Sequence, residues 1–335
     1  NATWTVEPEK TYLVHICNMG MFVLQYLYIE DHKMTVVEID GVATLPYETE
    51  SLKIAVAQRY SVLVTPKAVK KSKAFKFINI LDKEMLDVQP DDLQYISTNW
   101  MVIDDKKTHI EEDSKNFIEQ DEYDGIVDSL RPLDDMGLVP LDMQKLLTKV
   151  EHQIILDFEM ESLGDGVVYA MFNQVSYTAP KVPTLYTVFS GPKGEIANPL
   201  IYGSNSNTYV LKKDEVVEIV LNNMDPGDHP FHLHGHEFQV IERLEAEAGT
   251  YNSTKHRSEP KIPMRRDTIL VNANGYVVLR FKANNPGVWF FHCHVDWHLE
   301  QGLAITLVED PVGIRELNGV PQEHIQVCRE GNTPY

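Results

Sequence analysis

Short runs of alternating and β-branched residues dominate the chain. Residues 34–41 alternate apolar and polar side chains and stop at a turn glycine, as a half-buried strand does. Residues 53–65 predict either one long strand or a bent pair of strands. Three further β-branched runs, bounded by Asn, Gly, Pro or Asp, cover residues 216–221, 276–281 and 303–308. Many short strands at this spacing predict an all-β protein built from Greek-key sandwiches or barrels.

The distribution of acidic residues divides the chain. With 335 residues it is long enough for two sandwich cores. Residues 104–135 hold twelve acidic side chains against four basic ones and few large apolar residues, which is typical of a connection rather than a core element. We therefore predict a first domain at 1–103, an acidic connecting segment at 104–149 and a second domain at 150–335. A short helix is expected near 141–150.

Charge and composition exclude some classes of function. The net charge of −20 disfavours nucleic acid as a partner, because the phosphates would repel it. An acidic surface either keeps a protein soluble or attracts cations, and composition leaves both explanations open. No apolar run approaches the roughly 20 residues that a membrane helix needs. Two N-glycosylation sequons, at Asn1 and Asn252, favour a secreted glycoprotein.

Histidines gather in two short segments. The first reads His229-Pro-Phe-His-Leu-His-Gly-His236, and the second reads His292-Cys-His-Val-Asp-Trp-His298. Together they contain seven of the thirteen histidines and one of the three cysteines. A single His-X-His is common on surfaces without any metal. Two dense segments with a cysteine set between two histidines are not explained by chance, and they predict a metal centre.

Strand geometry separates the donors of the second segment. Because side chains alternate along a strand, His292 and His294 point to one face, about 7 Å apart, and Cys293 points to the other. A thiolate with two imidazoles is the ligand set of a blue-copper electron-transfer site. Cys293, His298 and one histidine of the first segment can supply it. Electrons can then pass from the thiolate through one peptide to either flanking histidine. Zinc also accepts His and Cys and is the alternative.

Both segments resemble the third-domain copper motifs of multicopper oxidases, the family that includes laccases and ferroxidases. The resemblance extends over the whole chain, through residues 30–41, 177–184, 263–268 and 285–294. It is greatest to the fungal cell-surface ferroxidases of high-affinity iron uptake. It implies two cupredoxin-like Greek-key β-sandwich domains, the second and third of such an oxidase, joined by the acidic connecting segment.

The resemblance assigns copper ligands within the two segments. For type 1 copper the matching residues are His229, Cys293 and His298; for type 2 copper, His232; and for type 3 copper, His234, His292 and His294. Leu303 matches the axial position of type 1 copper, where a leucine cannot bind the metal. His236 matches no ligand and is expected in an ordinary loop or behind the ligands.

The resemblance also implies a part that this sequence does not contain. A complete oxidase has a first domain with two further His-X-His pairs, which complete the trinuclear copper cluster. Nothing in residues 1–150 has that form, and His15, His32 and His109 are isolated. We expect the first cupredoxin domain outside this sequence, so this chain alone should not hold the cluster or reduce oxygen.

The cysteines outside the metal segments have separate roles. Three cysteines make a poor internal disulfide framework. Cys328 matches a C-terminal cysteine of the family and is expected to pair outside this segment. Cys17 stands where an apolar core residue is expected, so we predict a buried free thiol.

A ferroxidase must also bind Fe(II) with hard oxygen ligands beside the type 1 copper. Asp225 lies four residues before His229, close enough to hydrogen-bond that ligand and relay an electron. Spacing alone favours a turn-forming Asp before Pro-Gly, but the resemblance favours iron. It also places Asp87 and Tyr169 at the iron site, although a packing role explains Tyr169 equally well, and it puts a third carboxylate upstream of this sequence. Asp228 adjoins His229 and is assigned no role.

The resemblance implies an activity and partners. The intact enzyme would oxidise Fe(II) at type 1 copper and reduce O2 to water at the trinuclear cluster, using four electrons. It would work at the outer face of the plasma membrane. Acidic residues such as Glu119 and Asp121 would hand Fe(III) to an iron permease, although a solvated linker also explains them. Two alternatives are a laccase-like oxidase of phenols or amines, which Glu300 resembles, and a non-catalytic blue-copper carrier or structural fragment.

Overall fold

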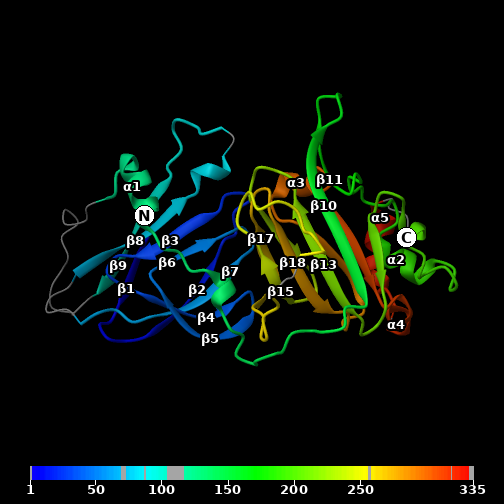
Figure 1. Cartoon of the computed structure of the whole chain (residues 1–335), viewed down its shortest axis with the longest axis horizontal. Coiled ribbons are helices and arrows are strands. Elements are labelled where there is room, and N and C mark those ends of the chain that lie inside the picture. The colour runs from blue at the N-terminus through cyan, green and yellow to red at the C-terminus, as the bar shows by residue number, and fades with distance from the viewer. Residues whose placement is uncertain are drawn as a thin grey trace. The chain divides into compact units, whose positions relative to one another are not determined.

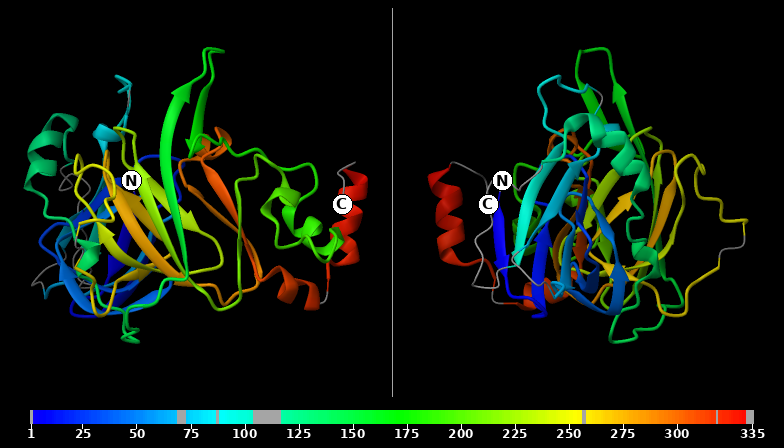
Figure 2. Two further views of the ribbon diagram at one scale, coloured as in Figure 1. Left: turned by 45° about the vertical axis from the view of Figure 1, so that its right-hand side comes forward. Right: turned by 90° about the vertical axis from the view of Figure 1, so that its left-hand side faces the viewer.

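Two compact units make up the chain, Asn1–Met143 and Gln144–Tyr335. The computed structural model describes residues 2–68, 73–86, 88–103, 117–255, 258–317 and 319–331. Each unit is built mainly from two β-sheets, with short helices at the edges (Figures 1 and 2). The division between the units falls inside the segment 104–149 that we predicted as the connection.

The first unit has a five-stranded sheet in the order β1-β9-β8-β3-β6 and a four-stranded sheet in the order β2-β7-β4-β5. Its strands are β1 (Thr3–Val6), β2 (Tyr12–Cys17), β3 (Gln25–Ile29), β4 (Met34–Ile39), β5 (Val42–Thr49), β6 (Ser51–Ile54), β7 (Arg59–Val64), β8 (Lys73–Leu81) and β9 (Ile96–Ile103). The predicted run 53–65 is a bent pair, because its start belongs to β6 in one sheet and its end to β7 in the other. The chain crosses between the sheets at the turn between them.

Part of the acidic segment packs on the first unit. The short helix η3 (Gln120–Glu122) leads into α1 (Tyr123–Ser129). Tyr123 is buried against Ile78, Ile80 and Ile96. Its hydroxyl donates to the carbonyl of Leu81 at 3.0 Å. Two more single-turn helices of this unit are η1 (Lys83–Met85) and η4 (Asp135–Gly137).

The second unit has a six-stranded sheet in the order β11-β10-β13-β18-β15-β16 and a five-stranded sheet in the order β12-β20-β19-β14-β17. Its strands are β10 (His152–Ser162), β11 (Val168–Phe172), β12 (Thr208–Leu211), β13 (Val216–Asn223), β14 (His229–Leu233), β15 (Phe238–Arg243), β16 (Arg265–Arg266), β17 (Thr268–Val271), β18 (Tyr276–Lys282), β19 (Gly287–Cys293) and β20 (Ala304–Glu309). The three apolar runs predicted in this half form β13, β18 and β20. These strands are buried almost throughout, which explains why they read as continuous apolar runs.

The helices of the second unit are short. They are α2 (Thr184–Ser190), η5 (Pro199–Tyr202), α3 (Asp296–Glu300), α4 (Pro311–Glu316) and α5 (Gln322–Glu330). The prediction of a helix near 141–150 is wrong, since these residues form a turn and extended chain. The Leu147 N–H donates to Gln239 Oε1 at 2.8 Å, and the Leu146 N–H donates to the Lys261 carbonyl at 3.1 Å. Tertiary partners therefore replace helical hydrogen bonds. No helix in the described ranges is long and apolar enough to span a membrane.

The prediction that Cys17 is buried is also wrong, because its free thiol is exposed. It ends β2, an edge strand whose side chains alternate between exposed and half-buried positions. Cys17 shares the exposed face with Leu13 and His15. The apolar residues around it in the sequence therefore do not indicate burial of the thiol. The side chain of Cys328 lies outside the described residues.

Candidate metal centre

Antiparallel pairing of β14 and β19 brings the two histidine segments together. Phe231 lies opposite Cys293, and His232 lies opposite His292. Opposed residues of an antiparallel pair share a face, and successive residues alternate. The thiol of Cys293 therefore points to one face of the sheet, while the imidazoles of His232 and His292 point to the other.

On the thiol's face, His229, Cys293 and His298 converge. Cys293 Sγ lies 3.7 Å from His229 Nδ1 and 3.6 Å from His298 Nδ1. The three donor atoms all lie within 4.8 Å of one another. A trigonal site with a metal–sulfur bond of about 2.3 Å and metal–nitrogen bonds of about 2.0 Å separates sulfur from nitrogen by about 3.7 Å. Both sulfur–nitrogen distances thus match those around a single metal ion.

Backbone hydrogen bonds hold two of the three donors in place. His229 begins β14, Cys293 ends β19 and His298 lies in α3, which follows at once. The Cys293 N–H donates to the Leu303 carbonyl at 3.1 Å, and the Leu303 N–H donates to the His298 carbonyl at 2.9 Å. Leu303 is thereby fixed beside two of the donors. It is fully buried, and its side chain offers no donor atom.

The electrostatics of this group suit a metal ion. Burial raises the pKa of the Cys293 thiol to about 12 and lowers the pKa of His298 to about 4. Both groups are therefore neutral around pH 7 when no cation is bound. A bound cation favours the thiolate and the free imidazole lone pair. A thiolate with two imidazoles in a trigonal arrangement fits copper.

A second group of imidazoles occupies the opposite face. Ring centroids are 4.7 Å apart for His232 and His234, 5.2 Å for His234 and His292, and 5.5 Å for His292 and His294. The Nε2 atoms of His234 and His292 are 3.1 Å apart. His294 Nδ1 is buried and has no hydrogen-bond partner among the described residues. Bound metal ions would give these clustered imidazole nitrogens, and the unpaired His294 Nδ1, the partners that buried polar atoms need.

The pKa values of two of these imidazoles are lowered, and the rings of two are held in fixed orientations. Burial, with repulsion from neighbouring imidazoles, lowers the pKa of His292 to about 3 and also lowers the pKa of His234. His292 Nδ1 donates to the Cys293 carbonyl at 2.8 Å, so its Nε2 carries the lone pair. His232 Nδ1 lies 3.0 Å from the Asp267 carbonyl, which fixes that ring in the same way.

Asp225 connects the first group to solvent. Its Oδ2 lies 2.9 Å from His229 Nε2, and its side chain is 23% exposed where that of His229 is 2% exposed. Burial alone would raise the pKa of Asp225, but the hydrogen bonds from His229 and from the Gly227 N–H hold it below its usual value. The carboxylate is therefore ionised and accepts from His229 Nε2–H. This leaves the Nδ1 lone pair of His229 facing Cys293.

Of the other residues predicted at the iron site, Tyr169 makes its side-chain hydrogen bond within its own hairpin. Tyr169 lies in β11, and its hydroxyl donates to Asp165 Oδ2 at 2.7 Å within the β10–β11 hairpin, the long green pair of strands in Figure 1. Asp87 lies outside the described residues. Asp228 accepts from the Ala273 N–H at 2.9 Å, so it anchors a neighbouring turn.

His236 has a partner that sequence reasoning missed. Its Nε2 lies 2.6 Å from Glu309 Oε2, and both side chains are buried. The two residues are 73 positions apart, and Glu309 simply ends an apolar strand in the sequence. Phe158, whose ring centroid lies 4.6 Å from that of His229, was also missed. In the sequence, the one local indication that Glu309 has a structural partner is its position at the end of an apolar run.

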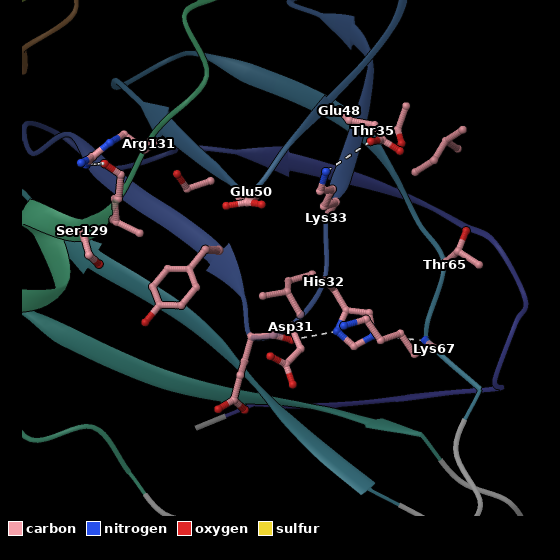
Figure 3. Close-up of a pocket in the computed structure, with 16 residues that line it drawn as sticks. Asp31, His32, Lys33, Thr35, Glu48, Glu50, Thr65, Lys67, Ser129 and Arg131 are labelled. Carbon is pink, nitrogen blue, oxygen red and sulfur yellow. Dashed lines mark hydrogen bonds and ion pairs between the residues drawn. The ribbon is translucent and has the colours of Figure 1, made fainter.

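The described residues of unit 1 form a polar pocket and no comparable donor group. Figure 3 shows His32, Lys33, Glu48 and Lys67 among the residues that line it. His32 Nδ1 donates to the Glu30 carbonyl at 2.8 Å, and Nε2 accepts from the Lys67 N–H at 3.2 Å. Lys33 pairs with Glu48 at 3.6 Å. Both ring nitrogens of His32 are thus engaged by the protein itself.

Comparison with known proteins decides the family. Family models described as multicopper oxidase match residues 1–87 and 177–313. The chain belongs to the multicopper oxidase family. It is 49% identical to "Iron transport multicopper oxidase FET3" of Candida albicans over its whole length, and 47% identical over 98% of its length to the Saccharomyces cerevisiae protein of that name. It spans 52% and 51% of these two relatives, about half of each.

Solved structures agree with this assignment. The crystal structure of Fet3p, a multicopper oxidase described as functioning in iron import, has a TM-score of 0.91 and 45% identity, and the match covers all of this chain and 62% of that one. A laccase from Botrytis aclada has a TM-score of 0.76 at 22% identity, covering 98% of this chain and 56% of that one, which shows a shared fold. The predicted all-β cupredoxin-like fold is confirmed. Family membership indicates copper, and not zinc, as the cofactor of this multicopper oxidase chain.

Proposed function

We propose that the intact protein is a ferroxidase of iron uptake, which oxidises Fe(II) to Fe(III) and reduces O2 to water. The observation that carries the proposal is the bond between the part-exposed Asp225 carboxylate and the buried His229 imidazole. A carboxylate is a hard oxygen ligand for iron, and it stabilises Fe(III) more than Fe(II). The iron-transport names of the relatives support the same reaction.

Each residue of the centre has a role in this proposal. Copper held by His229, Cys293 and His298 would supply the one-electron redox chemistry that side chains lack. Asp225 binds Fe(II) at the surface and touches a copper ligand at 2.9 Å, which shortens the electron's path. Cys293 lies one peptide bond from His292 and from His294, so it leads on to the second group of imidazoles. Their remaining partners are expected in a first cupredoxin domain.

A laccase-like oxidation of phenols or amines is the second candidate. Met224 and Trp297 are 50% and 41% exposed, and they adjoin Asp225 and His298 in the sequence. Such apolar surface suits an aromatic substrate better than an aquated iron ion. Glu300, the residue that resembles a laccase in the sequence, ends α3 and is exposed.

Substrate selectivity separates the two candidates. In the intact, copper-loaded protein, Asp225→Ala and Asp87→Ala should each lower kcat/KM for Fe(II) while sparing a phenol or an aromatic diamine. The matched control is Asp214→Ala, which removes a half-exposed acid paired with Lys282 elsewhere in the second unit. Equal losses for iron and for the aromatic substrate would overturn the iron site. Failure to consume O2 with either substrate would favour a non-catalytic electron carrier.

The proposal extends to location and partners. We propose that the protein is secreted or held at the outer face of the plasma membrane and passes Fe(III) to an iron permease. Asn252 is exposed in a turn, where Thr254 bonds its side-chain oxygen. Glu119 and Asp121 are exposed acids that could face a permease. Endoglycosidase treatment should change the electrophoretic mobility of the Asn252→Gln variant less than that of the wild type. The double variant Glu119→Ala, Asp121→Ala should lower cellular iron uptake without lowering Fe(II) oxidation in solution.

A further inference from the structure

Glu309 is a buried carboxylate with two partners. It ends β20 and is 0% exposed. Its Oε2 lies 2.6 Å from His236 Nε2, and its Oε1 accepts from the Asn285 N–H. A buried carboxylate without partners is strongly destabilising, so both contacts are needed. Glu309 thereby ties three chain segments together: the turn after β14, the turn before β19 and the end of β20.

The turn after β14 carries His234 two residues before His236, and a dense set of contacts fixes it. Asn285 Nδ2 donates to the Gly235 carbonyl at 2.9 Å. The His234 N–H donates to the Phe290 carbonyl at 2.9 Å. The His236 ring lies 4.8 Å from the Phe281 ring, centroid to centroid, so apolar packing also holds it. The ring of His236 therefore serves as an anchor for this turn.

The turn before β19 is fixed by the same network. Asn285 accepts at its carbonyl from Trp289 Nε1 at 2.8 Å. Trp289 is part of β19, which carries His292 farther along. Because Glu309 binds the backbone of Asn285 and the ring of His236, it joins the turn that carries His234 to the strand that carries His292. Those two imidazoles face each other at 3.1 Å.

We propose that Glu309 and His236 are positioning residues for the type 3 copper pair. They fix His234 relative to His292, while the type 1 group depends on other bonds, such as those between Cys293, Leu303 and His298. The proposal rests on the assignment of His234 and His292 as copper ligands. It predicts that loss of the Glu309 anchor weakens the type 3 pair and leaves the blue type 1 site intact.

The test uses the intact, copper-loaded protein with three variants. Glu309→Leu removes both bonds, and Glu309→Gln keeps the shape and one acceptor for Asn285. Glu215→Leu is the matched control, because Glu215 is another acid paired with a histidine of this unit, His152 at 3.1 Å, away from the copper ligands. Readouts are the near-ultraviolet type 3 absorption, the blue type 1 absorption, the copper content under chelator competition and the thermal midpoint.

We expect Glu309→Leu to release type 3 copper to a chelator about 10–100-fold more readily, the usual effect of removing a residue that orients a ligand. Its type 3 absorption should fall while its type 1 absorption stays. Glu309→Gln should lie between it and the wild type. Glu215→Leu should change the thermal midpoint but neither absorption.

Three outcomes would overturn the proposal. One is an unchanged type 3 absorption and copper affinity in Glu309→Leu. Another is parallel loss of type 1 and type 3 absorption in Glu309→Gln, which keeps the fold. The third is an equal loss of type 3 copper in Glu215→Leu. If the wild type itself has no type 3 absorption, the copper assignment has failed instead, so the two failures are distinguishable.

Discussion

The imidazole of His229 joins the carboxylate of Asp225 to the thiol of Cys293. Its Nε2 lies 2.9 Å from Asp225 Oδ2, and its Nδ1 lies 3.7 Å from Cys293 Sγ. One ring therefore spans the distance between a part-exposed acid and a fully buried sulfur. An electron that enters at Asp225 has a path of a single hydrogen bond and a single side chain to the proposed type 1 copper.

Asp225→Asn tests this path without removing the hydrogen-bonding position. The amide keeps an oxygen near His229 but loses the negative charge. Because a hydrogen bond to a charged group contributes about 1.5–3 kcal/mol, we expect kcat/KM for Fe(II) to fall about tenfold or more. The reduction potential of type 1 copper should rise, since an anion no longer stabilises the oxidised ion. Potentiometric titration and Fe(II) kinetics of the intact protein measure both, with Asp228→Asn as the control. Unchanged potential and kinetics would contradict this role of Asp225.

Position 235 requires glycine, and a substitution can test this requirement. Its φ is +74°, and an added Cβ would meet the Trp289 ring at 2.4 Å. We expect Gly235→Ala to lower the free energy of unfolding by about 2–4 kcal/mol, through left-handed strain and overpacking together. Gly249→Ala is the control, because its φ is +83° with nothing within 4 Å, so it should cost only about 1 kcal/mol. Denaturant unfolding checks this, and equal losses in the two variants would show that Trp289 does not constrain Gly235.

Local pattern predicted the strands better than the segments between them. The runs that form β13, β18 and β20 are buried on both faces, so apolar composition alone identifies them. The helix predicted at 141–150 does not form, because the backbone there is hydrogen-bonded to Gln239 and Lys261, about 90 to 115 positions away in the sequence. Helical propensity has no information about such distant partners.

His32 should make stability depend on pH. Burial lowers its pKa from the ordinary value of 6.5, and its Nε2 accepts from the Lys67 N–H, a bond that protonation would break (Figure 3). The unfolded chain therefore binds the proton more readily than the folded one. The contribution of His32 to stability is complete above pH 6.5 and decreases as pH falls below it.

Thermal unfolding of the intact protein at pH 7.5 and 5.5 measures this effect. The midpoint of the wild type should fall more between these values than that of His32→Gln, whose amide can donate and accept but does not titrate. The same fall in both proteins would assign the pH dependence to other groups.

The two described free thiols should differ in reactivity. Cys17 is exposed, whereas Cys293 is 0% exposed and burial raises its pKa to about 12. The thiolate is the reactive form, so iodoacetamide should modify Cys17 in the native protein and Cys293 only after unfolding. Peptide mass spectrometry locates the label, and Cys17→Ser should abolish native labelling at that peptide. Rapid native labelling of Cys293 would contradict its burial.

The donor groups show what spacing can and cannot predict. Alternation along one strand was enough to separate Cys293 from His292 and His294, because that geometry is local. The partner of His236 could not be predicted from the sequence, since only the fold brings Glu309 to it. The same holds for Cys17, whose exposure follows from the position of β2 at a sheet edge.

The central claim is that His229, Cys293 and His298 hold one copper ion. The most direct measurement is the visible absorption and electron paramagnetic resonance of the intact, copper-loaded protein beside its Cys293→Ser variant. We predict an intense blue thiolate-to-copper band with a type 1 resonance in the wild type, and loss of both, together with about one copper ion per chain, in the variant. A wild type without the blue band, or a variant that retains it, would show that these three residues do not hold the copper ion.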